Sequence, residues 1–169
     1  MGRGFVQYHL AESGREEWVL LSAFINYRLA DGTKLPILQR PAWCPACGRF
    51  VIAELVPPAE EIEEELSKYR SADRDALQMW AFVSDGASVG ARIAELARRI
   101  EWRRARRSPP RCLECGSLGP VPIPAAGEFS HPHTGERVVV GDSGWADTAP
   151  WFAEFSPEGE QLGRTNRCT

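Results

Sequence analysis

The sequence has no uninterrupted run of about 18 apolar residues, which a membrane-spanning helix would need. Its beginning lacks the charged-then-apolar plan of a secretory signal, and Val6 stands where a myristoylation motif prefers Ser or Thr. The net charge of −3 is too small to indicate a polyanionic or polycationic partner for the chain as a whole. These absences predict a cytoplasmic protein without a membrane partner.

Motifs that carry catalysis are also missing. The sequence contains neither a G-x-S-x-G nucleophile elbow nor a phosphate-binding glycine loop. Residue types that hydrolases use do occur in the last part of the chain, where their surroundings favour turns: Ser130, Asp142, Ser143 and Asp147. The sequence therefore selects no reaction and favours a protein that is not an enzyme.

Cysteine is the most informative residue type in this chain. The sequence has five cysteines, an odd number that does not suit a disulfide framework, and four of them form two C-x-x-C pairs. A glycine follows each pair, and its freedom to adopt positive φ closes a turn in which backbone N–H groups face the sulfurs. Four thiolates make a tetrahedral set that suits one structural Zn²⁺. The predicted zinc ligands are Cys44, Cys47, Cys112 and Cys115.

Other roles for the cysteines stay open at this point. A redox C-x-x-C pair usually follows a strand and opens a helix, and neither pair here opens an obvious helix. An iron–sulfur cluster can also be held by four cysteines. The fifth cysteine, Cys168, lies next to the C-terminus and is expected to be a free thiol.

Apolar and aromatic residues predict strands on both sides of a helical middle. The predicted strands cover residues 5–10, 18–29, 33–38, 50–56, 137–140 and 151–155. Asp31-Gly32 supplies a hairpin turn, and residues 156–159 a second turn. Ser13 and Glu16 have capping-box spacing, so a short helix over residues 16–24 is the alternative to strand there.

Residues 58–107 show helical periodicity in two stretches. Apolar residues recur at spacings of three and four up to Val83, and again from Val89 to Ile100. Ser84-Asp85-Gly86 separates the stretches, which predicts an antiparallel helical hairpin. The chain is thus expected to be one α+β domain over residues 1–169. In it, residues 1–57 and 108–169 form an antiparallel β module and residues 58–107 form the inserted hairpin.

The two C-x-x-C-G turns and their flanking strands resemble a zinc ribbon over residues 43–56 and 111–120. The plan is similar to that of bacterial zinc-ribbon proteins, and the resemblance implies a metal-binding module without a particular activity. In zinc ribbons, some tens of residues or fewer commonly separate the two cysteine turns, whereas 64 residues lie between the two pairs here. A hairpin that returns the chain to its starting point explains the longer separation.

Basic residues are concentrated before the second cysteine pair, with Trp102 among them. The cluster consists of Arg98, Arg99, Arg103, Arg104, Arg106, Arg107 and Arg111. Basic and aromatic side chains are what phosphate contact and base stacking require. In a hairpin, however, these arginines lie beside the acidic start of the first helix, so ion pairs and helix dipoles explain much of the clustering. Nucleic-acid binding through Arg103, Arg104, Arg106, Arg107 and Arg111 is therefore the secondary hypothesis.

His131-Pro132-His133 raises the question of a second metal site, completed by His9 or Cys168. A metal site needs three or four convergent ligands, and no spacing in the sequence assures them. The favoured interpretation is a turn with two exposed histidines. The leading functional hypothesis is then a non-enzymatic zinc-binding scaffold or adaptor, whose helical hairpin binds a protein partner.

Overall fold

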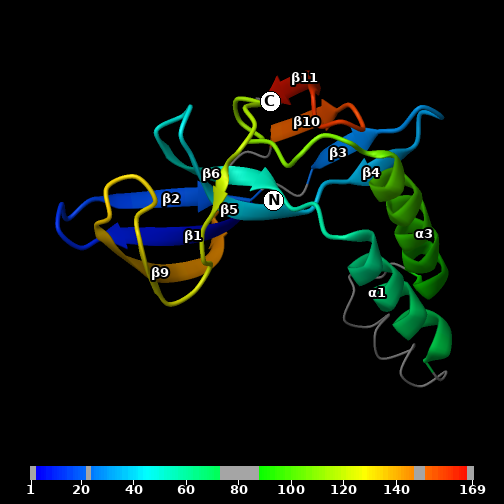
Figure 1. Ribbon diagram of the computed structural model, residues 1–169, viewed down its shortest axis with the longest axis horizontal. Coiled ribbons are helices and arrows are strands. Elements are labelled where there is room, and N and C mark those ends of the chain that lie inside the picture. The colour runs from blue at the N-terminus through cyan, green and yellow to red at the C-terminus, as the bar shows by residue number, and fades with distance from the viewer. Residues whose placement is uncertain (1–2, 22–23, 73–87, 147–150, 167–169) are drawn as a thin grey trace. The chain divides into compact units, whose positions relative to one another are not determined.

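The computed structural model describes residues 3–21, 24–72, 88–146 and 151–166 (Figure 1). The chain divides into two compact units: Met1–Leu55 with Ser108–Thr169, and Val56–Arg107. The described residues of the first unit form three β-sheets, and those of the second unit contain two helices. The predicted α+β class is confirmed.

The first sheet of the β unit contains strands from both ends of the chain. Its order is β2-β1-β9-β8, with β1 at Arg3–Leu10, β2 at Glu16–Leu20, β8 at Glu128–Ser130 and β9 at Arg137–Ala146. All of its neighbouring strands are antiparallel. Residues 16–20 form a strand, so the alternative helix is wrong there. Asp142 and Ser143 also lie in a strand, near an irregularity in its pairing with β1, and the turn expected for them is wrong.

The second sheet shows that the single strand predicted over residues 18–29 is wrong. Its order is β11-β10-β3-β4, with β3 at Ile25–Arg28, β4 at Lys34–Pro36, β10 at Trp151–Phe155 and β11 at Gln161–Asn166. The segment is therefore divided between two sheets, because β2 ends at Leu20 and pairs with β1 instead. The predicted turns are present: Gly32 and Gly159 both have a φ of +80°.

The third sheet carries the first cysteine pair. Its order is β6-β5-β7, with β5 at Gln39–Cys44, β6 at Arg49–Glu54 and β7 at Val121–Pro122. Every residue of β6 after Arg49 is buried, so this strand belongs to the core of the unit. The ring of Phe50 lies 5.0 Å from that of Tyr8 in β1, which joins the first and third sheets through aromatic contact.

The helical unit contains α1 (Ala59–Ser71) and α3 (Val89–Ala105). Pro58 precedes α1, and Ser88 caps α3 because its hydroxyl accepts a hydrogen bond from the backbone N–H of Ala91 at 3.1 Å. The apolar stripes of the two helices form one cluster of four buried residues, Ile62, Leu66, Leu96 and Ile100. Burial of one stripe from each helix is what stabilises such a pair.

Ion pairs show how the two helices are aligned. Glu63 near the start of α1 pairs with Arg104 near the end of α3, at 2.7 Å. Glu65 pairs with Arg92, also at 2.7 Å. The expected contact between the acidic start of the first helix and the basic end of the second is therefore present. Residues 73–87 lie outside the described part of the chain, so the turn at Ser84-Asp85-Gly86, and with it the complete hairpin, stays a prediction.

No helix among the described residues has both the length and the apolar character needed to cross a membrane. The longer of the two, α3, has 17 residues and contains several arginines. A helix that spans the bilayer needs about 20 mainly apolar residues. The finding agrees with the absence of long apolar runs from the sequence.

Candidate metal centre

The first cysteine pair lies in the turn that joins β5 to β6. Cys44 ends β5 and stands opposite Arg49, the first residue of β6. The turn closes with a hydrogen bond of 2.9 Å from the N–H of Gly48 to the carbonyl of Cys44. Gly48 has a φ of +64°, a conformation that other residues adopt only with strain. The predicted role of this glycine is confirmed.

The second pair forms a turn of the same kind. The N–H of Gly116 donates to the carbonyl of Cys112 at 2.9 Å, and Gly116 has a φ of +75°. A bridge between Arg111 and Leu118 closes the loop at its base. Sequence reasoning expected both glycines to have positive φ, and both do.

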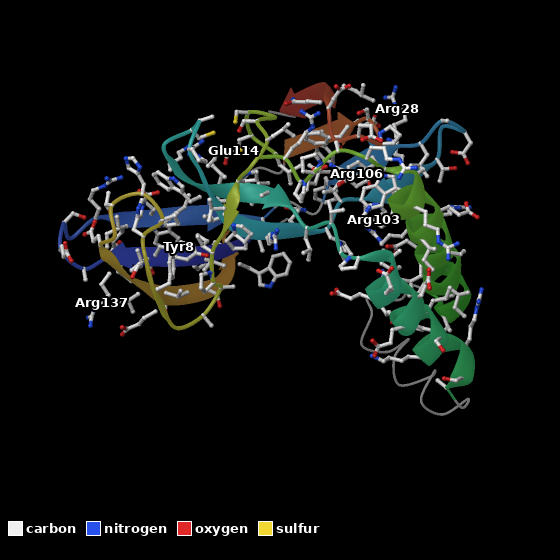
Figure 2. The ribbon with its side chains drawn as sticks, viewed as in Figure 1. Tyr8, Arg28, Arg103, Arg106, Glu114 and Arg137 are labelled. Carbon is white, nitrogen blue, oxygen red and sulfur yellow. The ribbon has the colours of Figure 1, made fainter. Side chains whose placement is uncertain are left out.

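Backbone pairing with β6 brings the two turns together. The N–H of Leu113 donates to the carbonyl of Ile52 at 3.1 Å, and the N–H of Glu54 donates to the carbonyl of Arg111 at 3.0 Å. Cys112 thus lies beside Ala53 on the strand that begins directly after the first turn. An ion pair between Arg49 and Glu114 adds a link between the turns; Glu114 is labelled in Figure 2.

The four sulfurs converge as one metal site requires. All lie within 4.8 Å of one another, and the Sγ atoms are 3.7 Å apart for Cys44 and Cys115 and 3.9 Å apart for Cys47 and Cys112. Four sulfurs at the usual Zn–S distance of about 2.3 Å have tetrahedral edges of about 3.8 Å. A disulfide would need about 2.05 Å. The four cysteines are free thiols, and their arrangement can hold one metal ion.

Burial opposes ionisation at two of the thiols. Burial raises the pKa of the Cys112 thiol to about 12, although backbone N–H groups of Cys115 and Glu114 act against this rise. Burial also raises the pKa of Cys47 well above its usual range, and hydrogen bonds with the neighbouring thiols add to the effect. A bound cation removes this obstacle, because coordination deprotonates a thiol outright.

Cys115 shows the opposite behaviour. Burial alone would raise its pKa, but hydrogen bonds from the hydroxyl and the backbone N–H of Ser117 outweigh that effect and lower the pKa to about 6. The Ser117 hydroxyl oxygen lies 3.1 Å from the sulfur of Cys115 and 3.2 Å from that of Cys44. Ser117 thus supports one sulfur from each cysteine pair, a contact that sequence reasoning did not identify.

A buried carboxylate connects the site to the rest of the β unit. Glu54, at the end of β6, is fully buried and accepts hydrogen bonds from the hydroxyl of Tyr27 at 2.7 Å and from the N–H of Arg111 at 2.8 Å. Sequence reasoning missed this contact because its partners are far apart in the chain. A glutamate directly after four apolar residues was the only local signal.

The predicted turn with two exposed histidines is only partly right. His133 is exposed, but His131 has 4% of its surface exposed and its ring centre lies 4.3 Å from that of Trp43. Its Nδ1 accepts hydrogen bonds from the backbone N–H groups of His133 and Thr134, both at 3.1 Å. Burial lowers the pKa of His131, against the opposing effect of Glu17 and Glu136.

A second metal site does not form among the described residues. The four cysteines are the one group of three or more His, Cys, Asp or Glu ligand atoms there that lie close enough to share an ion. His9 pairs with Glu16 instead, at 3.1 Å. Cys168, and Asp147 among the residues considered for hydrolysis, lie outside the described part of the chain.

Most of the clustered arginines have contacts within their own unit. In the helical unit, Arg104 pairs with Glu63 and buried Arg99 pairs with Glu95, both at 2.7 Å. Arg103 donates from Nε to the carbonyl of Pro57 at 3.0 Å. The remaining members are placed as follows: Arg106 is buried over the ring of Trp102, Arg98 and Arg107 are exposed, and Arg111 donates to the carbonyls of Gly116 and Glu158 in the β unit.

Comparisons of the chain with protein-family models, with curated proteins and with solved structures find no match. The zinc-ribbon resemblance over residues 43–56 and 111–120 therefore rests on the local motif alone. The function has to be argued from the chemistry of the cysteine site and from the surfaces of the two units.

Proposed function

We propose that this chain is a zinc-binding scaffold protein, in which one structural Zn²⁺ joins the two cysteine turns. The observation that carries the proposal is the spacing of the sulfurs, which agrees with the edges of a tetrahedron around zinc. The ligands are Cys44, Cys47, Cys112 and Cys115. The ion thereby connects two parts of the chain that are 64 residues apart in the sequence.

The ligand set supports a structural role for the ion. Catalytic zinc sites keep a position open for water or substrate, whereas four thiolates complete a tetrahedral coordination shell. Cys44 and Cys112 are fully buried and Cys115 is exposed, so the complete coordination shell, and not burial, is what excludes substrate from the ion. Structural sites of this kind contribute apparent binding free energies of about 10–16 kcal/mol. Only the folded state gains this free energy, because only the folded state holds the four ligands together.

Zinc fits the site better than an iron–sulfur cluster. A cluster places several metal atoms and inorganic sulfides between the cysteine ligands. Sulfurs that all lie within 4.8 Å of one another enclose room for a single ion. Purified protein that carries a cluster would show visible absorption, whereas the zinc form has none.

The helical unit is the proposed protein-binding part of the scaffold. Its helices present charged side chains around a shared apolar core. Nucleic-acid binding, the secondary hypothesis, is less well supported because Arg99, Arg103 and Arg104 already have contacts within the unit. Trp102 has 4% of its surface exposed, so its ring is not available for base stacking.

Metal analysis of the purified full chain tests the zinc proposal. The expected result is one zinc per chain, lost in Cys44→Ser and in Cys112→Ser. Cys168→Ser is the matched control because it removes the one cysteine outside the proposed site, and it should retain the metal. A folded protein without bound metal would refute the proposal.

Titration with single-stranded DNA and RNA at low and high salt tests the secondary hypothesis. If the chain is a scaffold that does not bind nucleic acid, replacing the exposed Arg107 should not change the titration with DNA or RNA. Binding that weakens steeply with salt and is lost on replacing Arg103 and Arg107 would instead assign the chain to nucleic-acid-binding proteins. Zinc content should be measured in the same variants, so that a change in folding is not mistaken for a lost contact.

A further inference from the structure

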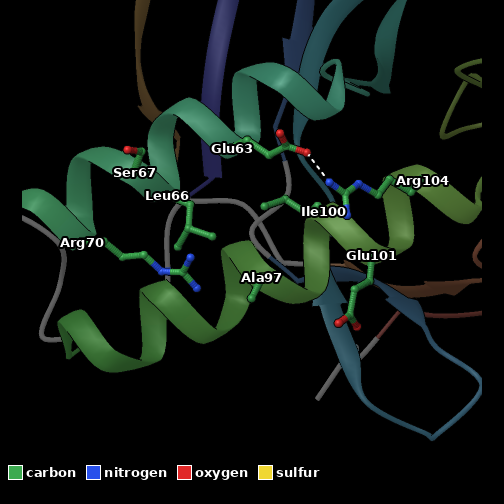
Figure 3. A pocket seen from close by; sticks show the side chains of 8 residues that line it. All are labelled: Glu63, Leu66, Ser67, Arg70, Ala97, Ile100, Glu101 and Arg104. Atoms are coloured by element: carbon green, nitrogen blue, oxygen red, sulfur yellow. Dashed lines mark hydrogen bonds and ion pairs between the residues drawn. The ribbon is translucent and has the colours of Figure 1, made fainter.

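A groove of about 360 Å³ runs between the two helices of the helical unit (Figure 3). Leu66 of α1 and Ile100 of α3 form its floor, and the small side chains of Ser67 and Ala97 border it. Charged side chains complete its edges: Glu63, Arg70, Glu101 and Arg104. An apolar floor with a charged rim is the usual composition of a protein-binding surface.

The charges along the groove are arranged as a dipole. Glu63 and Arg104 pair with each other at 2.7 Å and are neutral together. Within the described part of the chain, neither Arg70 nor Glu101 has an ion pair or a hydrogen bond through its side chain. Arg70 lies in the last turn of α1, and Glu101 lies near the opposite end of the groove, beside Arg104 (Figure 3). One end thus has a net positive charge and the other a net negative charge.

We propose that a second copy of this chain occupies the groove, so that two helix pairs form a four-helix arrangement. A two-fold axis that lies in the interface, at right angles to the length of the groove, brings the two grooves face to face. Each end of one groove then lies against the opposite end of the other. Arg70 of each copy lies opposite Glu101 of the other, while Ser67 and Ala97 of the two copies meet at the centre, above the buried Leu66 and Ile100. The surface is therefore complementary to itself in both charge and polarity.

Other occupants satisfy these groups less well. A nucleic acid has no reason to prefer a groove whose four charged residues sum to zero. A strongly acidic or strongly basic helix would pair with one end of the groove and be repelled at the other. A second copy supplies one charge of each sign at the required ends.

The size of the surface sets the expected strength of association. The 13 residues of α1 and the 17 of α3 span about 20 and 25 Å at the usual rise per residue. A face of this size is smaller than that of a typical stable complex. We therefore expect a reversible dimer with a micromolar dissociation constant.

This inference rests on the proposed role of the helical unit as a protein-binding surface and names its partner. It does not depend on the metal, because none of the four cysteines belongs to the helical unit. Failure of the zinc proposal and failure of the dimer proposal can therefore be observed separately. Metal content reports on the first, and the mass of the particle in solution reports on the second.

Sedimentation of the purified full chain across the micromolar concentration range tests the proposal with two charge reversals. In Arg70→Glu both ends of the groove are acidic, and in Glu101→Arg both ends are basic. Like charges then face each other in each homodimer, so each variant alone should associate at least about tenfold more weakly than the unmodified chain. An equimolar mixture of the two variants should form a heterodimer, because every facing pair is again of opposite sign.

The control is Glu61→Lys, which reverses an exposed charge of α1 that does not line the groove. It should leave the dimer unchanged, and far-ultraviolet circular dichroism checks that every variant keeps its helices. A chain that is monomeric at every concentration would overturn the proposal, as would a dimer that both reversals leave intact. A zinc-loaded monomer refutes the dimer alone, whereas a metal-free dimer refutes the zinc site alone.

Discussion

The hydroxyl of Tyr27 lies 2.7 Å from Oε1 of Glu54 and donates a hydrogen bond to it inside the β unit. The other oxygen of the same carboxylate accepts the N–H of Arg111, the residue directly before the second cysteine turn. One fully buried side chain therefore connects β3, the end of β6 and the approach to Cys112. A buried carboxylate is tolerated in a core only when its oxygens are hydrogen-bonded.

Replacing Tyr27 by Phe should therefore destabilise the β unit. The change leaves a buried carboxyl oxygen without its hydrogen-bond donor, a loss that costs about 1–3 kcal/mol. Tyr8→Phe is the matched control: its hydroxyl donates to the neutral carbonyl of Pro124, at 3.1 Å, and its loss should cost about 0.5–1.5 kcal/mol. Denaturant unfolding measures both, and equal losses in the two variants would contradict this role for Glu54.

The glycines of the two cysteine turns should not tolerate a side chain. Gly48→Ala or Gly116→Ala places a Cβ on a residue with a φ of +64° or +75°, at a cost of about 1–2 kcal/mol. The same change at Gly90, which lies in α3 and has no backbone strain, should instead stabilise the helical unit by about 0.4–1 kcal/mol. Unfolding measured by circular dichroism distinguishes these signs. A stabilising effect at either turn would contradict the structure.

Ser117→Ala should weaken zinc binding without abolishing it. The Ser117 hydroxyl lies within hydrogen-bond distance of the sulfurs of Cys44 and Cys115, and such supporting contacts typically contribute a factor of about 10–100 in metal affinity. Competition with a chromogenic chelator measures the change. Ser108→Ala is the control, because its hydroxyl donates to the carbonyl of Glu158 and not to a sulfur. Unchanged affinity in the Ser117 variant would show that the hydroxyl has no such role.

His131 should make the stability of the β unit fall in mild acid. Burial lowers its folded-state pKa below the unfolded value of about 6.5, so the unfolded state takes up the proton first. The stabilising contribution of His131 to the free energy of unfolding is complete above that pH and is lost as the pH falls through it. Protonation at Nδ1 would also break the hydrogen bonds from His133 and Thr134.

The variant His131→Asn separates this effect from the pH dependence of metal binding. Asn retains a side-chain acceptor for the two backbone N–H groups but does not titrate. With zinc saturating, the difference in unfolding free energy between about pH 7.5 and pH 5.5 should be smaller in the variant than in the unmodified chain. An identical difference in the two proteins would contradict the assignment.

Local patterns predicted the features that depend on neighbouring residues. The spacing of the cysteines and the glycine after each pair predicted two turns that the structure contains, and helical periodicity predicted where α1 and α3 lie. Features that depend on distant residues were missed. Residues 18–29 read as one apolar strand, but β2 pairs with β1 while β3 pairs with β10 in parallel, and no local signal encodes that choice.

The histidine segment shows the same limit. Between Ser130 and Thr134 the sequence is polar and contains a proline, which is typical of an exposed turn. Contact with Trp43, which is distant in the sequence, nevertheless buries the ring of His131. Tertiary packing thus overrode the local composition.

Removal of the metal should affect the two units differently. Cys44 lies next to the start of β6 and Cys112 pairs with Ala53 near its end, so loss of the ion releases both turns from this strand. The core of the helical unit contains no cysteine. After treatment with a strong chelator, hydrogen exchange should therefore accelerate at the amides of Glu54 and Leu113, which donate to the carbonyls of Arg111 and Ile52, far more than at the amide of Leu96. The same chelator added to Cys44→Ser, which lacks the site, should change neither exchange rate. Equal acceleration in both units of the unmodified chain would refute the proposal that the ion stabilises the β unit alone.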